Sequence, residues 1–469
     1  MFSSFSALSV CGRQAARLAA VTLVSGLTVA AGPAMAVPAA AGSGAAQTHG
    51  GAAATMGGLK TYGAAVVHAA EGDLEISAGL FEMSVEGGGT LQTYCVDLYN
   101  PTQKDAKYHE TSWSGTSLGA NDDAGRIRWI LQNSYPQVND LAALAKKAGI
   151  RGGLTEQDAA AGTQVAIWRY SDGVDVDAVD PEAEKLADHL EKSARDAAEP
   201  EASLTLDPPA LSGHPGELLG PVTVHTDADS VTVTPPPDAA AHGVRIVGKD
   251  GKDVTTATDG SRLFFEVPAD AAAGSAELTV QASTTVPVGR AFASESRSQT
   301  QILAGSSEST VSATVSATWA EKGAIPALSA QENCAEGGVD ITAVNQGDEA
   351  FTFELMGAEH TIGAGESSTV TIPLQEDQAY DFTITGPGGY EKRFAGVLDC
   401  RTQADEADEA GESTQILSEP SPATAGGTAS DVNLAATGSS DATPVIAGAA
   451  IGLVVIGGAA LVVVRRKKV

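Results

Sequence analysis

Cys95, in the stretch TYCVDLYNPT at 93–102, is the residue of this 469-residue chain best suited to covalent chemistry. Its thiolate would be a strong nucleophile if a nearby base took the thiol proton. His109 is the nearest histidine in the sequence, and Asp97 shares a strand face with Cys95. One hypothesis is therefore a secreted cysteine hydrolase or transferase that uses Cys95 and His109. Another is a structural protein with an inert thiol, because free cysteine packs well in protein cores.

A third interpretation depends on a second stretch, GTQVAIWRY, at 162–170. YCVDL followed by TQVAIW resembles the thioester domain of Gram-positive surface adhesins, whose second motif is Thr-Gln-x-Ala. The resemblance covers about 59–198. It implies that Cys95 and Gln164 join side chain to side chain in an intramolecular thioester, with Thr163 and Ala166 completing the motif.

The resemblance implies a defined sequence of bond changes. Gln164 would supply the acyl carbon and lose ammonia when Cys95 attacks. No cofactor is needed if the fold holds the two groups in contact. An amine, such as a lysine on an unidentified surface or host protein, would then form an amide and release the Cys95 thiol. The resemblance therefore implies an adhesin that binds covalently once, and not an enzyme.

Several residues are candidates for supporting this chemistry. Backbone amides, Thr163 or Asp97 could stabilise the oxyanion or move a proton, and Thr163 could equally be an ordinary helix-surface residue. Gln164 and Trp168 are four apart, so they share one helix face. The aromatic residues that could exclude water are Tyr94, Tyr99, Trp129, Trp168 and Tyr170.

The two ends of the chain predict export and anchoring. Residues 1–36 read as a signal peptide, with Arg13 and Arg17 before an apolar run and a small-x-small pattern ending at Ala36. Near the other end, the apolar run 444–464 would span a bilayer as a helix. The basic tail 465–469 would stay in the cytoplasm.

Leu434-Ala-Ala-Thr437-Gly438 stands just before that span. The order of this motif, the apolar span and the basic tail resembles the cell-wall sorting signal of Gram-positive bacteria. The LAATG form resembles the variant that is common among actinobacteria. The resemblance implies that a sortase cuts between Thr437 and Gly438 and joins Thr437 to peptidoglycan. We therefore expect a secreted, wall-anchored protein that has a membrane helix before sorting.

The composition is strongly acidic, with 28 Lys and Arg against 59 Asp and Glu. This charge disfavours nucleic acid and anionic lipid as partners. No histidine pair or carboxylate cluster has convincing metal-ligand spacing, so the sequence predicts no metal and no cofactor.

Hydrophobic patterning predicts a multidomain protein. An α+β thioester domain at 59–198 has strands first and then helices, near 122–133, 138–148, 155–170 and 181–197. All-β, sandwich-like stalk domains follow at 199–325 and 326–402. The remaining segments are a disordered Ala/Gly-rich stretch at 37–58 and an acidic, Pro-rich wall linker at 403–433. Two TQIL copies, at 300–303 and 414–417, are too short to indicate a repeat.

Cys334 and Cys400 bracket the last β domain. In an oxidising compartment we expect them to pair. Their disulfide would close the loop 335–399, which stabilises the fold by about 4 kcal/mol in the chain-entropy model.

Overall fold

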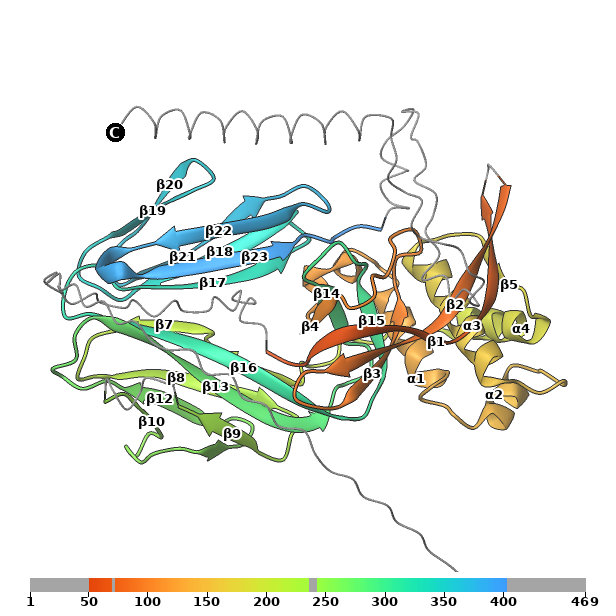
Figure 1. Cartoon of the computed structure of the whole chain (residues 1–469), viewed down its shortest axis with the longest axis horizontal. Helices are drawn as coiled ribbons and strands as arrows, with labels where there is room; N and C mark the ends of the chain where they lie inside the picture. Colours follow the sequence, from red (N-terminus) through yellow and green to blue (C-terminus); the bar gives the residue numbers. More distant parts are fainter. Residues whose placement is uncertain (1–49, 70–71, 236–242, 403–469) are drawn as a thin grey trace, which may run out of the picture. The chain divides into compact units, whose positions relative to one another are not determined.

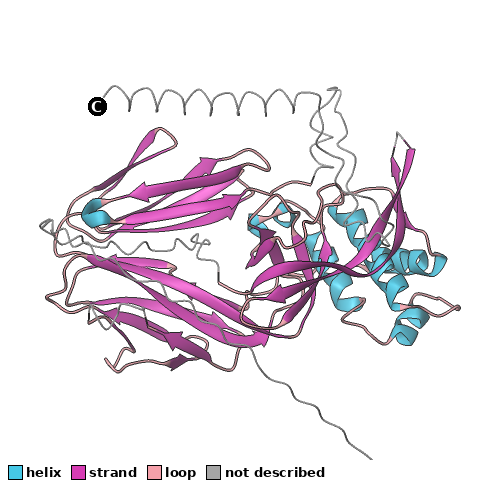
Figure 2. Ribbon diagram, in the orientation of Figure 1, coloured by secondary structure: helices cyan, strands magenta, loops and turns pink. Residues whose placement is uncertain are grey.

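The computed structural model describes residues 50–69, 72–235 and 243–402 (Figure 1). The predicted signal peptide, wall linker, sorting motif and apolar span lie outside these residues. In the part of the chain that is described, no helix has the length and apolar character needed to cross a membrane. Figure 2 shows a mostly β chain whose α-helices are grouped in one region.

The first β region is a seven-stranded sheet with the order β2-β3-β15-β14-β4-β1-β5. Because β1 pairs with both β2 and β4, the strands β1-β2-β3-β15-β14-β4 form a closed ring. The strands of this sheet are β1 Ala53–Ala69, β2 Gly72–Val85, β3 Thr90–Cys95, β4 Lys107–Thr111, β5 Val176–Ala178, β14 Ala291–Ser294 and β15 Gln301–Ser306.

Two segments of this ring correct the domain limits expected from the sequence. Strand β1 begins at Ala53, inside the stretch 37–58 expected to be disordered. Strands β14 and β15 come from the region assigned to the following sandwich, yet β15 pairs with β3 and β14 with β4. Arg290, just before β14, donates to Glu110 of β4 at 2.9 Å, and both side chains are buried. Such pairings join distant parts of the chain, so local periodicity could not reveal them.

Four α-helices accompany this sheet: α1 Ala124–Asn133, α2 Leu141–Lys147, α3 Glu156–Ser171 and α4 Pro181–Ser193. They confirm the helices expected from the sequence, with shorter ends for α2 and α4. Thr155 caps α3 through a reciprocal capping box with Asp158. Gly162 lets α4 approach closely, since a Cβ there would lie 2.4 Å from the Ala183 carbonyl oxygen. Helix α3 is therefore buried over most of its length and packs against β1 and β2.

The second β region contains a four-stranded sheet, β10-β12-β8-β6, and a five-stranded sheet, β11-β9-β13-β16-β7. Burial alternates along β16, Glu308–Trp319, as expected for a strand with one face in a core. The other strands are β6 Leu204–Asp207, β7 Ala210–Gly213, β8 Leu218–Thr226, β9 Val231–Thr234, β10 Arg245–Val247, β11 Thr256–Ala257, β12 Arg262–Glu266 and β13 Gly274–Thr285.

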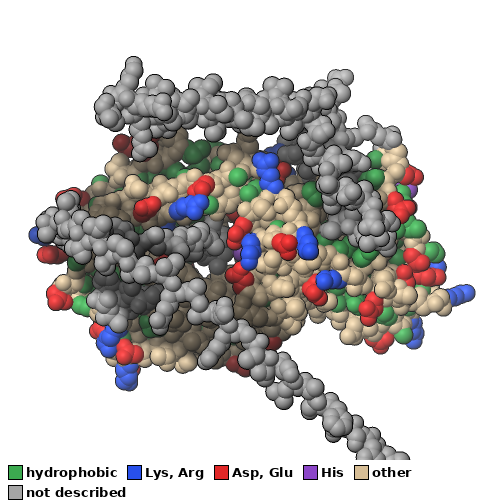
Figure 3. All heavy atoms as spheres, viewed as in Figure 1, with side chains coloured by type: hydrophobic (Ala, Val, Ile, Leu, Met, Phe, Trp, Pro, Cys, Tyr) green, Lys and Arg blue, Asp and Glu red, His purple; other side chains and the backbone are tan. Residues whose placement is uncertain are grey.

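The C-terminal β region has its own apolar core, which includes Val339, Ile341 and Phe351. Its sheets are β17-β18-β21, β19-β20 and β22-β23. Their bounds are β17 Pro326–Asn333, β18 Gly338–Asn345, β19 Phe351–Leu355, β20 Ala358–Ile362, β21 Glu366–Pro373, β22 Ala379–Thr385 and β23 Glu391–Val397. The structure confirms the expected disulfide between Cys334 and Cys400. On the face drawn in Figure 3, Lys and Arg are scattered among Asp and Glu.

Candidate thioester site

Cys95 is the last residue of β3, and its side chain is fully buried. Its sulfur lies 3.5 Å from Thr102 Oγ1 and 3.5 Å from Gln301 Nε2. Burial, with smaller contributions from the charges of Asp172 and Asp97, raises the pKa of the Cys95 thiol to about 12. The thiol is therefore protonated at neutral pH, and its reaction requires a partner that is already in place.

Gln164 of α3 provides such a partner. Its Oε1 accepts a hydrogen bond from the Cys95 main-chain N–H at 3.0 Å, and its Nε2 donates to the Cys95 carbonyl at 2.9 Å. Strand β2 pairs with β3 only as far as the Phe81–Thr93 pair, so beyond that point the Gln164 carboxamide takes the place of a strand neighbour. Gln164 is fully buried. The fold thus brings together the two residues that the sequence singled out.

The Thr163 hydroxyl forms hydrogen bonds within α3 and to the segment that follows α1. Its Oγ1 donates to the Ala159 carbonyl at 2.6 Å and lies 2.6 Å from Ser134 Oγ. No hydrogen bond between Thr163 and Cys95 is among those of the described residues. Ala166 is buried in the same helix. The contacts of Thr163 therefore fix α3 against the segment after α1, and they place no proton donor on the sulfur.

The aromatic candidates differ in burial. Trp168 is 1% exposed, and its Nε1 has no hydrogen-bond partner among the described residues. Tyr94 is also buried and donates its hydroxyl proton to the Tyr135 carbonyl at 2.9 Å. Tyr99, Trp129 and Tyr170 are only partly buried. Tyr94 and Trp168 are thus the two buried members of the set of aromatic candidates.

The loop after Cys95 is held by the side chains of Asp97 and Asp172. Asp97 Oδ1 accepts from the main-chain N–H groups of Tyr99 and Asn100 at 3.1 and 3.3 Å. Asp172, which ends α3, accepts from the Leu98 N–H at 3.0 Å. Burial raises the pKa of Asp97 well above its usual range, and the neighbouring Asp172 charge adds to this effect. Asp97 is thus a residue that shapes the loop after Cys95.

The structure does not bring His109 to Cys95. In the strand register, Cys95 lies opposite Gln301, Gln301 opposite Phe292, and Phe292 opposite Glu110. Directly opposed residues share a sheet face, and neighbours along a strand face opposite ways. His109 therefore points away from the Cys95 face, on a strand that is not adjacent to β3. Burial also lowers the pKa of His109 to about 4. This geometry does not support a Cys95–His109 catalytic pair.

Four polar residues of the site were missed in the sequence, which are Thr93, Thr102, Gln299 and Gln301. Gln301 Nε2 donates to Thr102 Oγ1 at 3.1 Å, and Gln301 Oε1 accepts from Thr93 Oγ1 at 3.0 Å. Gln299 holds the Cys95 loop by accepting from the Asp97 N–H at 3.2 Å. The only local signal was the first TQIL copy, which contains Gln301. Its role becomes visible only through the pairing of β15 with β3.

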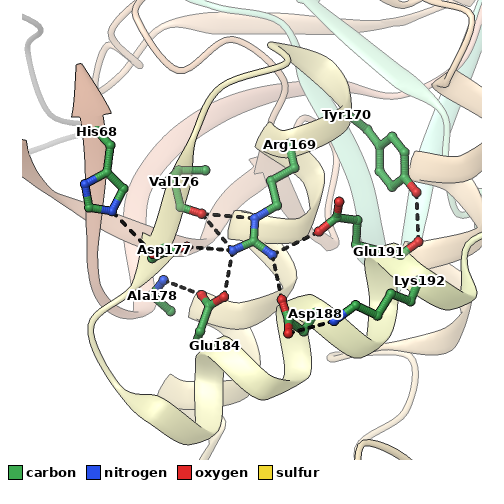
Figure 4. A network of polar contacts seen from close by, with 10 residues as sticks. All are labelled: His68, Arg169, Tyr170, Val176, Asp177, Ala178, Glu184, Asp188, Glu191 and Lys192. Atoms are coloured by element: carbon green, nitrogen blue, oxygen red, sulfur yellow. Dashed lines mark hydrogen bonds and ion pairs between the residues drawn. The ribbon is translucent and has the colours of Figure 1, made fainter. Parts of the chain in front are cut away.

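Arg169 fixes the far end of α3. Its guanidinium donates to the Val176 carbonyl of β5 at 3.0 and 2.8 Å. It also makes ion pairs with four acids of β5 and α4, which are Asp177, Glu184, Asp188 and Glu191. Figure 4 shows these groups converging on the guanidinium, with His68 joining through Asp177. Because Arg169 lies in the helix that carries Gln164, this network restrains the helix against sliding.

The remaining predicted site residues divide into two sets. Leu434, Thr437 and Gly438 lie outside the described residues. Cys334 and Cys400 form the disulfide already described. Within the described ranges, no group of three or more His, Cys, Asp or Glu side chains is arranged to hold a metal ion.

The closed strand ring thus buries Cys95 against the carboxamide of Gln164 from helix α3. Residues 92–196 match the family model described as thioester domain, which includes both Cys95 and Gln164. The chain is therefore a thioester-domain protein. Residues 324–397 match a second family model, described as bacterial phospholipase C, C-terminal domain. No curated protein matches the chain.

Similar solved structures include two TIE proteins. The Bacillus anthracis TIE protein is 16% identical, with a TM-score of 0.27, and the match covers 73% of this chain and 63% of that one. This chain thus spans less than two thirds of that relative. The thioester domain of the Enterococcus faecium TIE86 protein is 16% identical, with a TM-score of 0.27, and the match covers 59% of this chain and 99% of that one. The Escherichia coli chaperone DraB also matches, at 15% identity and a TM-score of 0.16, covering 42% and 98%.

Proposed function

We propose that this protein is a cell-wall-anchored adhesin that binds a target covalently through a Cys95–Gln164 thioester. The observation that carries the proposal is the pair of hydrogen bonds between the Gln164 carboxamide and the Cys95 main chain, at 3.0 and 2.9 Å. This contact makes the attack of the sulfur on the amide carbon an intramolecular reaction with a high effective concentration.

The same contacts suit the charges that develop during the reaction. As sulfur attacks Cδ of Gln164, negative charge grows on Oε1, which already accepts the Cys95 N–H. The C–N bond then breaks, and the thiol proton leaves with the amide nitrogen as ammonia. The Cys95 carbonyl oxygen orients that leaving nitrogen through the Nε2–H donor. The products are one thioester and one ammonia, so no oxidant or cofactor is consumed.

The stored acyl group would next react with a primary amine of the target. The amine nitrogen forms an amide with Cδ of Gln164, the C–S bond breaks, and the proton from the amine returns to Cys95 as a thiol. Each molecule reacts once, so the activity is covalent binding without turnover. A permanent bond suits adhesion, because a reversible contact is limited by its dissociation rate. Burial of Cys95 and Gln164 would protect the bond from water.

Anchoring is part of the proposal and comes from the sequence. The LAATG motif would be cut after Thr437 by a sortase, and peptidoglycan would be the covalent partner at this end. The β regions would then act as a stalk between the wall and the thioester domain. The target is an unidentified amine-bearing surface or host protein.

The test is the intact mass of the full chain before and after exposure to methylamine. The fragment 59–198 is unsuitable, because it lacks β14, β15 and the start of β1. We expect the untreated protein to be short by one ammonia. After treatment, peptide mapping should place methylamine on Gln164, and Cys95 should become alkylatable. The matched controls are Cys95→Ser and Gln164→Met, both of which should keep full mass. Full mass in the folded parent chain would refute the thioester and leave Cys95 as an inert thiol.

A further inference from the structure

The strand segment that completes the Cys95 site is bound by a residue from the C-terminal β region. The main-chain N–H and the hydroxyl of Thr300 both donate to Asp399 Oδ2, at 3.1 and 2.9 Å. Thr300 is fully buried. Two donors on one carboxylate oxygen fix the backbone and the side chain of Thr300 together.

Thr300 lies between the two glutamines that shape the site. On one side, Gln299 Nε2 donates to the Asn100 carbonyl at 2.6 Å, in addition to its contact with the Asp97 N–H. On the other side, Gln301 contacts the Cys95 sulfur and Thr102. A shift of Thr300 would therefore displace both the loop that follows Cys95 and the amide on its sulfur.

Asp399 is itself held in place by its neighbours. Cys400 is joined to Cys334, and the Cys400 N–H donates to Glu376 Oε1 at 2.7 Å. The Leu398 N–H donates to the Gln378 carbonyl at 3.2 Å. These restraints on both sides of Asp399 limit its movement.

The other half of the disulfide makes a second contact with the first β region. The Cys334 N–H donates to the Ser114 carbonyl at 3.0 Å. Glu332, at the end of β17, packs beside Gly115, where an added Cβ would lie 3.4 Å from the Glu332 Cβ. The disulfide thus connects two contacts between the C-terminal region and the thioester region, and one of these contacts is next to Gln301.

We propose that Asp399 is a positioning residue for thioester formation, which makes the C-terminal β region part of the thioester site and not only a stalk. The Asp399 carboxylate fixes Thr300, and Thr300 fixes Gln299 and Gln301 around Cys95. The inference rests on the proposed thioester function. It assigns the disulfide a role in that reaction, because Cys400 restrains Asp399.

The negative charge of Asp399 strengthens the hydrogen bonds that it accepts from Thr300. Burial raises its pKa to about 6, so at neutral pH the carboxylate is mainly ionised and accepts charge-assisted hydrogen bonds from Thr300. Its charge is also one of the influences that raise the pKa of Asp97. Asp399 therefore affects the Cys95 loop through Thr300 and through the electrostatic field.

The test compares full-length variants by intact mass. In Asp399→Ala and in Thr300→Val, we expect the ratio of ammonia-short to full-mass molecules to fall about tenfold, which corresponds to the loss of one charge-assisted hydrogen bond. Asp399→Asn retains an acceptor oxygen and should stay within about threefold of the parent ratio. The matched control is Asp381→Ala, which removes an exposed carboxylate of the same region that pairs with Arg393. This control should keep the parent ratio.

A double-mutant cycle makes the result specific. If Asp399 acts through Thr300, the Asp399→Ala/Thr300→Val double variant should be no worse than either single variant. Folding of each variant is checked by near-UV circular dichroism, and Thr300→Val carries the test if Asp399→Ala does not fold. Parent-like ratios in both single variants, or an Asp399→Asn ratio as low as that of Asp399→Ala, would overturn the positioning role. Full mass in the parent chain would instead refute the proposed function, and this inference would fall with it.

Discussion

Replacing Gln301 with leucine should destabilise the thioester region without changing its size much. Gln301 is fully buried, and its amide serves two buried hydroxyls, Thr93 at 3.0 Å and Thr102 at 3.1 Å. Leucine has a similar volume but neither donates nor accepts. The substitution therefore leaves both hydroxyls short of a partner in a site that excludes water.

The expected magnitude follows from these two contacts. A buried polar group that loses its partner costs about 1–3 kcal/mol. Thr102 keeps its contact with the Cys95 sulfur, so the free-energy cost of its missing partner lies at the low end of this range. Thr93 has no other hydrogen bond among those of the described residues, so its loss is larger. The sum is roughly 2–4 kcal/mol of unfolding free energy.

The assay is urea denaturation followed by tryptophan fluorescence. Trp113, Trp129 and Trp168 all report on the thioester region. The measurement is made in a Gln164→Met background, so that no internal crosslink forms while the Cys95 sulfur stays beside Thr102. The matched control is Gln137→Leu, the same substitution at an exposed site that makes one hydrogen bond to the β15 backbone. It should change the unfolding free energy by less than about 0.5 kcal/mol.

A second substitution tests the reasoning directly. Adding Thr93→Val to Gln301→Leu removes the hydroxyl that was left without a partner. The double variant should therefore recover at least about 1 kcal/mol relative to Gln301→Leu alone. Equal stability of Gln301→Leu and the parent, or no recovery in the double variant, would show that these hydrogen bonds do not support the fold as described.

Three further predictions concern groups around the site. Burial raises the pKa of Glu332 to about 7 from 4.5, so the folded state keeps its proton longer than the unfolded chain does. The unfolding free energy should therefore fall by up to about 3 kcal/mol as pH rises from 4.5 to 7. In pH-dependent urea titrations, Glu332→Gln should remove this part of the slope, whereas the exposed Glu336→Gln should not. Replacing Cys334 and Cys400 with serine should cost about 4 kcal/mol by the loop-closure estimate, measured as a lower denaturation midpoint of the C-terminal region, and an unchanged midpoint would contradict it. Arg169→Met leaves four acids facing one another and should cost about 3 kcal/mol in thermal or urea unfolding, whereas a loss below about 1 kcal/mol would mean that these ion pairs are solvent-screened.

The local elements of the thioester region could be predicted from the sequence. Thr155 and Asp158 predict the start of helix α3, and Asp172-Gly173 predicts its end. The alternation of residues in β16 predicts a strand with one buried face in the same way. Capping and periodicity depend on residues a few positions apart, so one sequence contains the whole signal.

The ring that holds Cys95 could not be predicted in this way. Strand β15 reads locally as part of the sandwich, and only its pairing with β3 places Gln301 on the sulfur. Likewise, the small residues before Trp168 predict a buried helix, but they do not say that Gln164 will bond to the Cys95 main chain. Both features depend on contacts between segments far apart in the chain.

The sequence by itself determined which residues could react. Cys95 and Gln164 stand in recognisable motifs, and they supply the thiol and the carboxamide that the proposed chemistry requires. Cys334 and Cys400 stand at the two ends of one β region because a disulfide requires two cysteines. Only the tertiary structure decided how Cys95 and Gln164 are held, with Gln301 beside the sulfur, His109 facing away and Asp399 hydrogen-bonded to Thr300. The reason is physical: strand register and domain contacts are set by packing over the whole chain, and no local pattern of residues records them.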